Sequence, residues 1–237
     1  MLHGLTGNGA CWTPVAQALE GEYDVIMPDA RGHGKSSVPN DGYRYEDLAK
    51  DVEGLIEVLG LSPPIMIGHS MGGMTAALVA SRKQKPLHCL ILADPTFLSP
   101  EVHREVFEGD TIKQHRQFLN KPFDEVLTEA QTRQPHRSFN TLKIINKARH
   151  QTSTIPFQIL TPPNPEYKQL VSEVDVQSLL VIADKGIISE ATAEELQSLN
   201  PKLQVEMITG AGHGLHYDQP EQFVAIVKSF LRLILKR

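Results

Sequence analysis

The chain has 237 residues, of which 41% are hydrophobic, and a formal net charge of −5 at pH 7. A chain of this length can bury a sizeable core, either as one large α/β domain or as one domain with an insertion. The negative charge is spread along the sequence, which argues against a nucleic-acid partner, and no apolar run approaches the ~20 residues that span a bilayer. We therefore expect a small-molecule substrate, no nucleic-acid partner and no membrane partner.

The two cysteines, Cys11 and Cys89, are far apart in the sequence and have no CxxC spacing. The first residues have neither a basic start nor an apolar signal core. These features predict a cytoplasmic protein with free thiols.

The N-terminal third alternates between turns, helices and strands. A glycine-rich turn at 3–9 precedes a helical pattern at 12–19, and a short buried strand is predicted at 23–29, followed by a loop at 31–37. Apolar residues recur at helical spacing over 45–59, and Gly60 ends this amphipathic helix.

The most informative stretch is 64–80, where an apolar strand ends in glycines around one serine and then becomes a helix. A side chain at such a sharp corner needs small neighbours, which Gly68 and Gly72 supply. Ser70 would then project alone at the N-terminus of the helix. There the backbone N–H of Met71 can bind a developing oxyanion.

Strands and helices alternate again after this corner. We expect strands at 87–93, 178–183 and 203–208 and helices at 189–199 and 220–233. The pattern predicts an α/β fold with a mostly parallel central sheet and helices on both faces. The alternation lapses at 97–176, which is polar, mostly helical and interrupted by prolines.

Within this middle segment, residues 113–149 contain eight Lys or Arg against three acids. A solvated helix face is the ordinary explanation. The alternative is an anion-attracting surface over the active site, which would favour acyl groups with a remote negative charge. Histidines here lack metal-ligand spacing, so we assign no metal and no cofactor.

Four motifs occur in an order that resembles the α/β-hydrolase fold enzymes, in the serine esterase-like branch. They are His3-Gly4-Leu5-Thr6-Gly7, Asp29-Ala30-Arg31-Gly32-His33-Gly34, Gly68-His69-Ser70-Met71-Gly72-Gly73 and Gly210-Ala211-Gly212-His213. The resemblance implies a hydrolase core at 1–96 and 177–237 with a helical cap inserted at 97–176. Serine at the corner argues against the haloalkane dehalogenase and epoxide hydrolase branches.

Serine is a poor nucleophile at neutral pH, so it needs a histidine base and a buried carboxylate that orients the histidine. The family's chain order assigns these roles to Ser70, Asp184 and His213. Asp94, which also follows a strand, is the alternative acid, and His216 is the alternative to His213. The resemblance also gives the second oxyanion donor as the N–H of Leu5, opposite that of Met71.

Two other histidines belong to these motifs. We interpret His33 and His69 as residues that brace loops rather than as catalysts.

One departure from the family concerns the strand before His3. In the family a hydrophobic central strand precedes this turn and lies between the strands of Val25 and Ile65, but only Met1 and Leu2 precede His3 here. We therefore expect N-terminal strands to be missing and the chain to be marginally stable as it stands. A second copy that fills the gap, in a homo-oligomer, is the less favoured alternative.

These interpretations predict a serine hydrolase that cleaves a small carboxylic ester or lactone through an acyl-enzyme. The alternatives are a ligand-binding sensor of the same fold with slow or no turnover, a carbon-carbon bond hydrolase, and a cofactor-free haloperoxidase-like relative.

Overall fold

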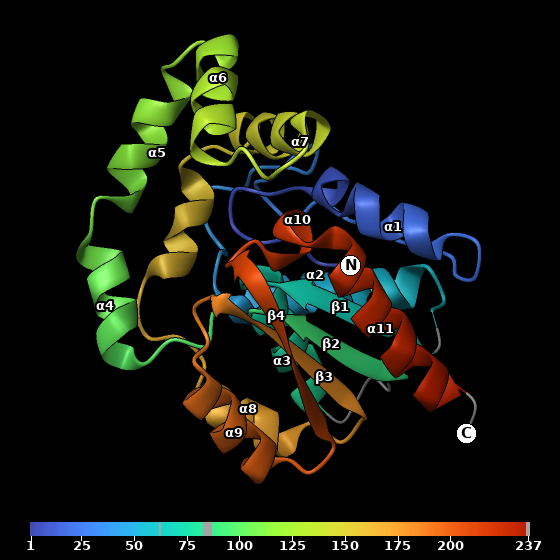
Figure 1. Ribbon diagram of the computed structural model, residues 1–237. Helices are drawn as coiled ribbons and strands as arrows, with labels where there is room; N and C mark the ends of the chain where they lie inside the picture. Colours follow the sequence, from blue (N-terminus) through green and yellow to red (C-terminus); the bar gives the residue numbers. More distant parts are fainter. Residues whose placement is uncertain (62, 83–86, 236–237) are drawn as a thin grey trace.

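The structure is a computed structural model that describes residues 1–61, 63–82 and 87–235 (Figure 1). The last two positions of the predicted core range 177–237 lie outside the described residues.

Four parallel strands form one sheet in the order β1-β2-β3-β4. Their bounds are Ile65–His69 for β1, Cys89–Ala93 for β2, Ser178–Lys185 for β3 and Leu203–Gly212 for β4. The register sets Ile67 beside Ile91 and Ile91 beside Leu179, and all three are buried. Such near-continuous apolar runs belong in strands that are covered on both faces. The predicted α/β class with a mostly parallel sheet is confirmed.

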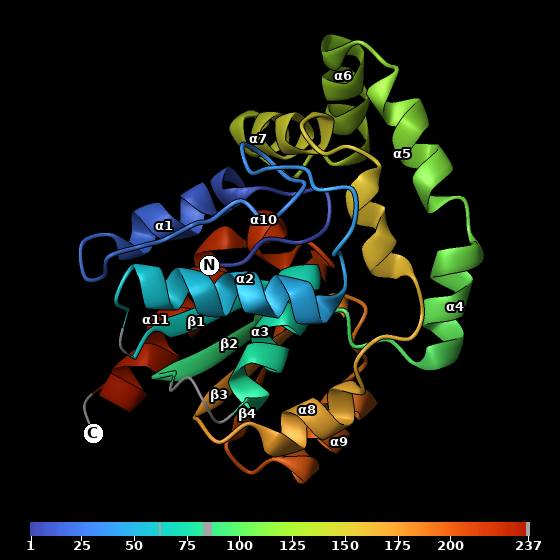
Figure 2. The ribbon, with the colours of Figure 1, turned by 180° about the vertical axis from the view of Figure 1, so that it is seen from behind.

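Helices cover both faces of the sheet, as Figures 1 and 2 show. On one face, α1 and α11 pack around Trp12 and Phe223, which are fully buried. On the other face lie α2, α3, α8 and α9, and α3 is buried nearly all round because its sequence is apolar all round. The bounds of these helices are Thr13–Leu19 (α1), Tyr45–Val58 (α2), Met71–Ser81 (α3), Tyr167–Glu173 (α8), Glu190–Leu199 (α9) and Pro220–Leu235 (α11).

The helices between β2 and α8 arch over the side of the sheet toward which the strands point (Figure 1). The side chains of Ser99 and Ser138 cap α4 and α7 by accepting the N–H groups of Val102 and Thr141. The elements of the arch are α4 (Pro100–Glu108), α5 (Thr111–Leu119), α6 (Phe123–Arg133), α7 (Phe139–His150) and the 3-10 helix η2 (Ile155–Leu160).

The division into a core and a cap at 97–176 stays a prediction. Within that range, α8 packs against α3 and so lies with the core, whereas α7 packs against the 3-10 helix η1 (Gly9–Trp12). Asn8 also donates to the Gln151 side chain, with Nδ2 and Oε1 3.0 Å apart, so the end of α7 is tied to the N-terminal turn. No helix in the described part of the chain is long and apolar enough to cross a membrane.

The segment predicted as a strand at 23–29 is not a strand, and this prediction was wrong. The hydrogen bond that ties it to the chain beside β1 runs from the Met1 amino group to the carbonyl oxygen of Ile26, at 2.7 Å. A strand needs a ladder of such bonds, and Leu2 forms only an isolated parallel bridge to Gly68. The sheet therefore has β1 at its edge, with Leu2 alone extending it.

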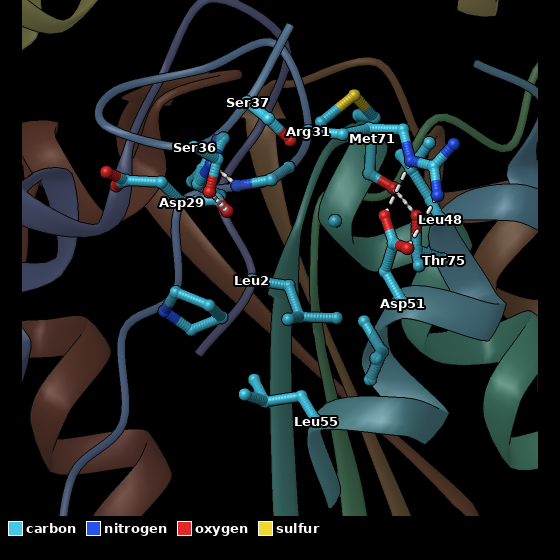
Figure 3. Close-up of a pocket in the computed structure, with 15 residues that line it drawn as sticks. Leu2, Asp29, Arg31, Ser36, Ser37, Leu48, Asp51, Leu55, Met71 and Thr75 are labelled. Carbon is cyan, nitrogen blue, oxygen red and sulfur yellow. Dashed lines mark hydrogen bonds and ion pairs between the residues drawn. The ribbon is translucent and has the colours of Figure 1, made fainter. Parts of the chain in front are cut away.

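Leu2 lines two cavities. The one in Figure 3 has a volume of about 460 Å³ and lies between Leu2 and α2 and α3, with the bidentate ion pair of Arg31 and Asp51 at its rim. The second, of about 320 Å³, is lined by Leu2, Val25 and the strand residues of β1. The second cavity lies between the segment of Val25 and the strand of Ile65, where the family resemblance leads us to expect a central strand.

Candidate active site

Ser70 stands at the sharp corner between β1 and α3. Its backbone has φ 55° and ψ −121°, a strained conformation for a residue with a side chain. The corner closes because its glycines lack side chains: a Cβ on Gly68 would lie 2.3 Å from the carbonyl oxygen of Gly72, and a Cβ on Gly72 would lie 2.4 Å from that of Leu2. The predicted strand, turn and helix around Ser70 are thus present.

A chain of hydrogen bonds runs from Ser70 through His213 to Asp94. His213 Nε2 lies 2.9 Å from Ser70 Oγ, and His213 Nδ1 lies 2.7 Å from Asp94 Oδ2. A carboxylate can only accept, so Nδ1 carries the proton toward Asp94 and the neutral ring presents Nε2 as an acceptor to the serine hydroxyl. This is the protonation state that a general base needs.

The carboxylate of Asp94 is fully buried and held by backbone groups. Oδ1 and Oδ2 accept the N–H of Ile187 at 3.2 and 3.0 Å, and Oδ1 accepts the N–H of Ile188 at 3.1 Å. Asp94 itself has a positive φ of 41°, and a Cβ on Gly186 would lie 2.8 Å from its Oδ2. The end of β3 thus wraps closely around the acid that follows β2.

The sequence preference for Asp184 as the acid must be corrected. Asp184 is exposed at the end of β3, and its Oδ1 accepts the N–H of Ala211 at 3.0 Å instead of facing His213. Hydrogen bonds from the N–H groups of Gly210 and Ala211 lower the pKa of this carboxyl group. Its role is to hold the β4 end, while the alternative acid, Asp94, occupies the position beside the histidine.

The structure also separates the two candidate histidines. His216 is buried, stacks on Trp12 with ring centroids 4.4 Å apart, and has no hydrogen-bond partner at either ring nitrogen. Burial, with His69 nearby, lowers its pKa well below the ordinary value. His213 and not His216 therefore contacts the serine.

His69, His33 and His3 bind backbone around the site. His69 Nε2 donates to the carbonyl oxygen of His213 at 2.8 Å, and burial, with His213 nearby, lowers the pKa of His69 to about 3. His33 Nδ1 donates to the carbonyl oxygen of Arg31 at 2.9 Å. His3 accepts the N–H of Ala30 at Nε2 and donates from Nδ1 to the carbonyl oxygen of Gly4. These contacts fit bracing residues, as expected for His33 and His69; the role of His3 is not evident from the sequence.

The turn that contains Leu5 lies directly against the serine. A Cβ on Gly4 would be 3.0 Å from the Cβ of Ser70, and the turn is closed by a hydrogen bond from the Gly7 N–H to the Gly4 carbonyl oxygen at 2.9 Å. Leu5 lines the same cavity as Ser70, and Met71 follows the serine as the first residue of α3. The two residues expected to supply the oxyanion donors thus lie next to Ser70.

The cavity over Ser70 and His213 has a volume of about 700 Å³ and is roofed by the arch. Arg137 and Arg149, from the α6–α7 connection and from α7, both line it. Arg137 is neutralised by Asp218, with Nε and Oδ1 2.6 Å apart. Among the described residues, no three His, Cys, Asp or Glu side chains gather as a metal site.

Comparisons with known proteins show the family of the chain. A family model described as alpha/beta hydrolase fold matches residues 1–220. The chain belongs to the α/β-hydrolase fold family. The predicted family is confirmed, and with it the assignment of the chain to the α/β-fold hydrolases.

Among curated members of this α/β-hydrolase family, the sn-1-specific diacylglycerol lipase ABHD11 of Mus musculus is 28% identical, over 97% of this chain and 79% of its own length. Lipase 3 of Moraxella sp. is 30% identical, over 90% of this chain and 70% of its own length. The crystal structure of E-2-(acetamidomethylene)succinate hydrolase superposes with a TM-score of 0.84 at 22% identity, over 98% of this chain and 90% of that one. At that identity the structural likeness concerns the fold.

Proposed function

We propose that this chain is a serine hydrolase that cleaves a small carboxylic ester or lactone through an acyl-enzyme intermediate. The observation that supports it most is the unbroken hydrogen-bonded chain from Ser70 through His213 to the buried Asp94. Similar proteins named as lipases and as an esterase/lipase support an ester over the other bonds that this fold cleaves.

In the first half of the proposed reaction, Ser70 Oγ attacks the ester carbonyl carbon and His213 Nε2 takes the hydroxyl proton. Asp94 stabilises the imidazolium through Nδ1–H, and the N–H groups of Leu5 and Met71 bind the oxyanion. When the carbon–oxygen bond to the leaving group breaks, His213 returns the proton to the departing alkoxide. The acyl group is then bonded to Ser70.

In the second half, water attacks the acyl carbon while His213 accepts its proton, and the Ser70–acyl bond breaks. The serine oxygen recovers the proton from His213, so a free acid is released and the enzyme is unchanged. The buried carboxylate of Asp94 accepts hydrogen bonds from the N–H groups of Ile187 and Ile188 and from His213, which hold it in place beside the histidine.

The test combines a fluorophosphonate probe with a panel of short-chain esters. We expect the probe to label the peptide that contains Ser70, and Ser70→Ala to lose the label and about 10⁶-fold in turnover. Ser172→Ala, an exposed serine on α8, serves as the matched control and should keep both.

A folded Ser70→Ala protein that retains activity within about tenfold would exclude the serine-hydrolase mechanism. Binding of esters without turnover by the unaltered chain would instead favour the ligand-binding sensor.

A further inference from the structure

The Arg149 guanidinium is a charge without a counter-ion in the cavity that contains Ser70 and His213. Its Nε is buried and has no hydrogen-bond partner, and no carboxylate of the described residues acts on it. Burial, with Arg133 nearby, lowers its pKa. Arg149 thus has unmet hydrogen-bonding capacity and lines a substrate-sized cavity.

The position of Arg149 is fixed on the protein side. Its guanidinium carbon lies 4.0 Å from the centroid of the buried Phe118 ring, in a cation–π contact, and the residue also lines the cavity. The next turn of chain is tied to the N-terminal turn by the bond between Asn8 and Gln151. Arg149 is therefore held by packing rather than by a salt bridge.

The other charges in the cavity do not compensate Arg149. Asp218 is the acid that lines it, and this carboxylate is already bound by Arg137 and by His136, with His136 Nε2 2.8 Å from Oδ1. Burial raises the pKa of Asp218 while the Arg137 and His136 hydrogen bonds lower it, and the net change is a decrease. Lys185, at the end of β3, adds a further cation to the lining.

We propose that Arg149 is a specificity residue that binds a carboxylate on the acyl part of the substrate, so that the ester cleaved at Ser70 is a half-ester of a dicarboxylic acid. A guanidinium fork pairs with the two oxygens of a carboxylate in parallel, which supplies both charge and orientation. This inference rests on the proposed hydrolase function and adds the class of substrate. It also assigns the preference for negatively charged acyl groups, which the sequence suggested for the basic segment at 113–149 as a whole, to the single residue Arg149.

The test compares monoethyl glutarate with the ethyl ester of glutaramic acid, which has the same shape and leaving group but no charge. We expect the unaltered protein to prefer the charged ester in kcat/KM by at least about tenfold. Arg149→Gln should lower kcat/KM for the charged ester by about 10-fold to 100-fold, the effect of losing charge-assisted hydrogen bonds, and leave the neutral ester within about twofold. Arg149→Lys should recover only part of the loss.

Arg116→Gln is the matched control, because Arg116 is an exposed arginine on α5 that does not line the cavity. Equal losses in Arg116→Gln and Arg149→Gln would overturn the subsite and leave only general attraction by the basic segment. Equal kcat/KM for the two esters in the unaltered protein would also overturn it.

A binding measurement separates this inference from the hydrolase proposal. Calorimetric titration of glutarate into Ser70→Ala protein should give saturable binding that Arg149→Gln removes and Arg116→Gln keeps. If no ester is cleaved and Ser70 is not labelled, the hydrolase proposal fails, and the glutarate titration still decides the subsite: the absence of saturable binding overturns it.

Discussion

The substitution Asp94→Asn, which replaces the buried carboxylate by an amide, tests whether Asp94 rather than Asp184 is the acid that acts with His213. The carboxylate of Asp94 has no free position for an NH₂ group. Oδ2 accepts from His213 and Ile187, and Oδ1 accepts from Ile187 and Ile188. An amide nitrogen at either place therefore meets a backbone N–H donor.

The two orientations of the asparagine fail for different reasons. With NH₂ toward His213, the imidazole must accept at Nδ1 and carry its proton on Nε2, so it can no longer take the proton of Ser70. With NH₂ toward Ile188, a buried donor is left unpaired at a cost of ~1 to 3 kcal/mol, and the charge facing the imidazolium is lost. We expect turnover to fall by ~10⁴, or about 5 kcal/mol in activation free energy.

Asp184→Asn provides the matched control, because it is the same substitution at the end of the neighbouring strand. Asp184 is exposed and accepts the Ala211 N–H through one oxygen, which the asparagine oxygen can also do. We expect turnover within about threefold of the unaltered protein. The assay is kcat on a short-chain ester, with thermal melting of each variant to show that it is folded. If Asp184→Asn is the slower enzyme, or if folded Asp94→Asn stays within about tenfold of normal, the assignment of Asp94 is wrong.

Two further predictions concern the oxyanion donor and a buried histidine. Leu5→Pro should lower kcat by ~10² to 10³, because it removes one N–H donor to the oxyanion. The melting temperature should change little, because Thr6 has φ 68° and a turn of this shape accepts proline at the position before it. A kcat within about twofold of the unaltered protein would refute the role of the Leu5 N–H. Burial, with His3 nearby, lowers the pKa of His33 to about 3. Between about pH 6.5 and 3, this histidine is therefore protonated in the unfolded chain, where its pKa is ~6.5, but not in the folded chain. The free energy of unfolding consequently falls as the pH falls through this range. In urea titrations between about pH 6.5 and 4.5, His33→Gln should flatten this fall by up to ~1.4 kcal/mol per pH unit, and an unchanged slope would contradict the buried neutral His33.

The sequence was sufficient for the local parts of this site. The apolar run before Ser70, the glycines around it and the helix-forming run after it dictate a strand, a corner and a helix whatever surrounds them. The Gly-rich end of β4 likewise identified His213, and the apolar runs at 87–93, 178–183 and 203–208 identified the remaining strands. These features depend on residues that are close together in the chain.

The strand predicted at 23–29 could not be decided in this way. Its residues have the composition of a buried strand, but a strand exists only when a neighbour supplies a hydrogen-bonded ladder. In the structure that neighbour is reduced to the bridge between Leu2 and Gly68. The composition of a segment indicates its tendency to form a strand, but whether it pairs with a neighbouring strand depends on the rest of the fold.

The choice between Asp94 and Asp184 was also decided only by the tertiary structure. Asp94 directly follows β2 and Asp184 lies at the end of β3, so both side chains are expected near the same edge of the sheet. The positive φ of Asp94 directs its carboxylate toward His213. The close approach of Gly186 brings the N–H groups of Ile187 and Ile188 to the same carboxylate. The sequence thus identified Ser70 and His213, because their motifs are local. The carboxylate beside His213 was set by backbone contacts between residues about 90 positions apart.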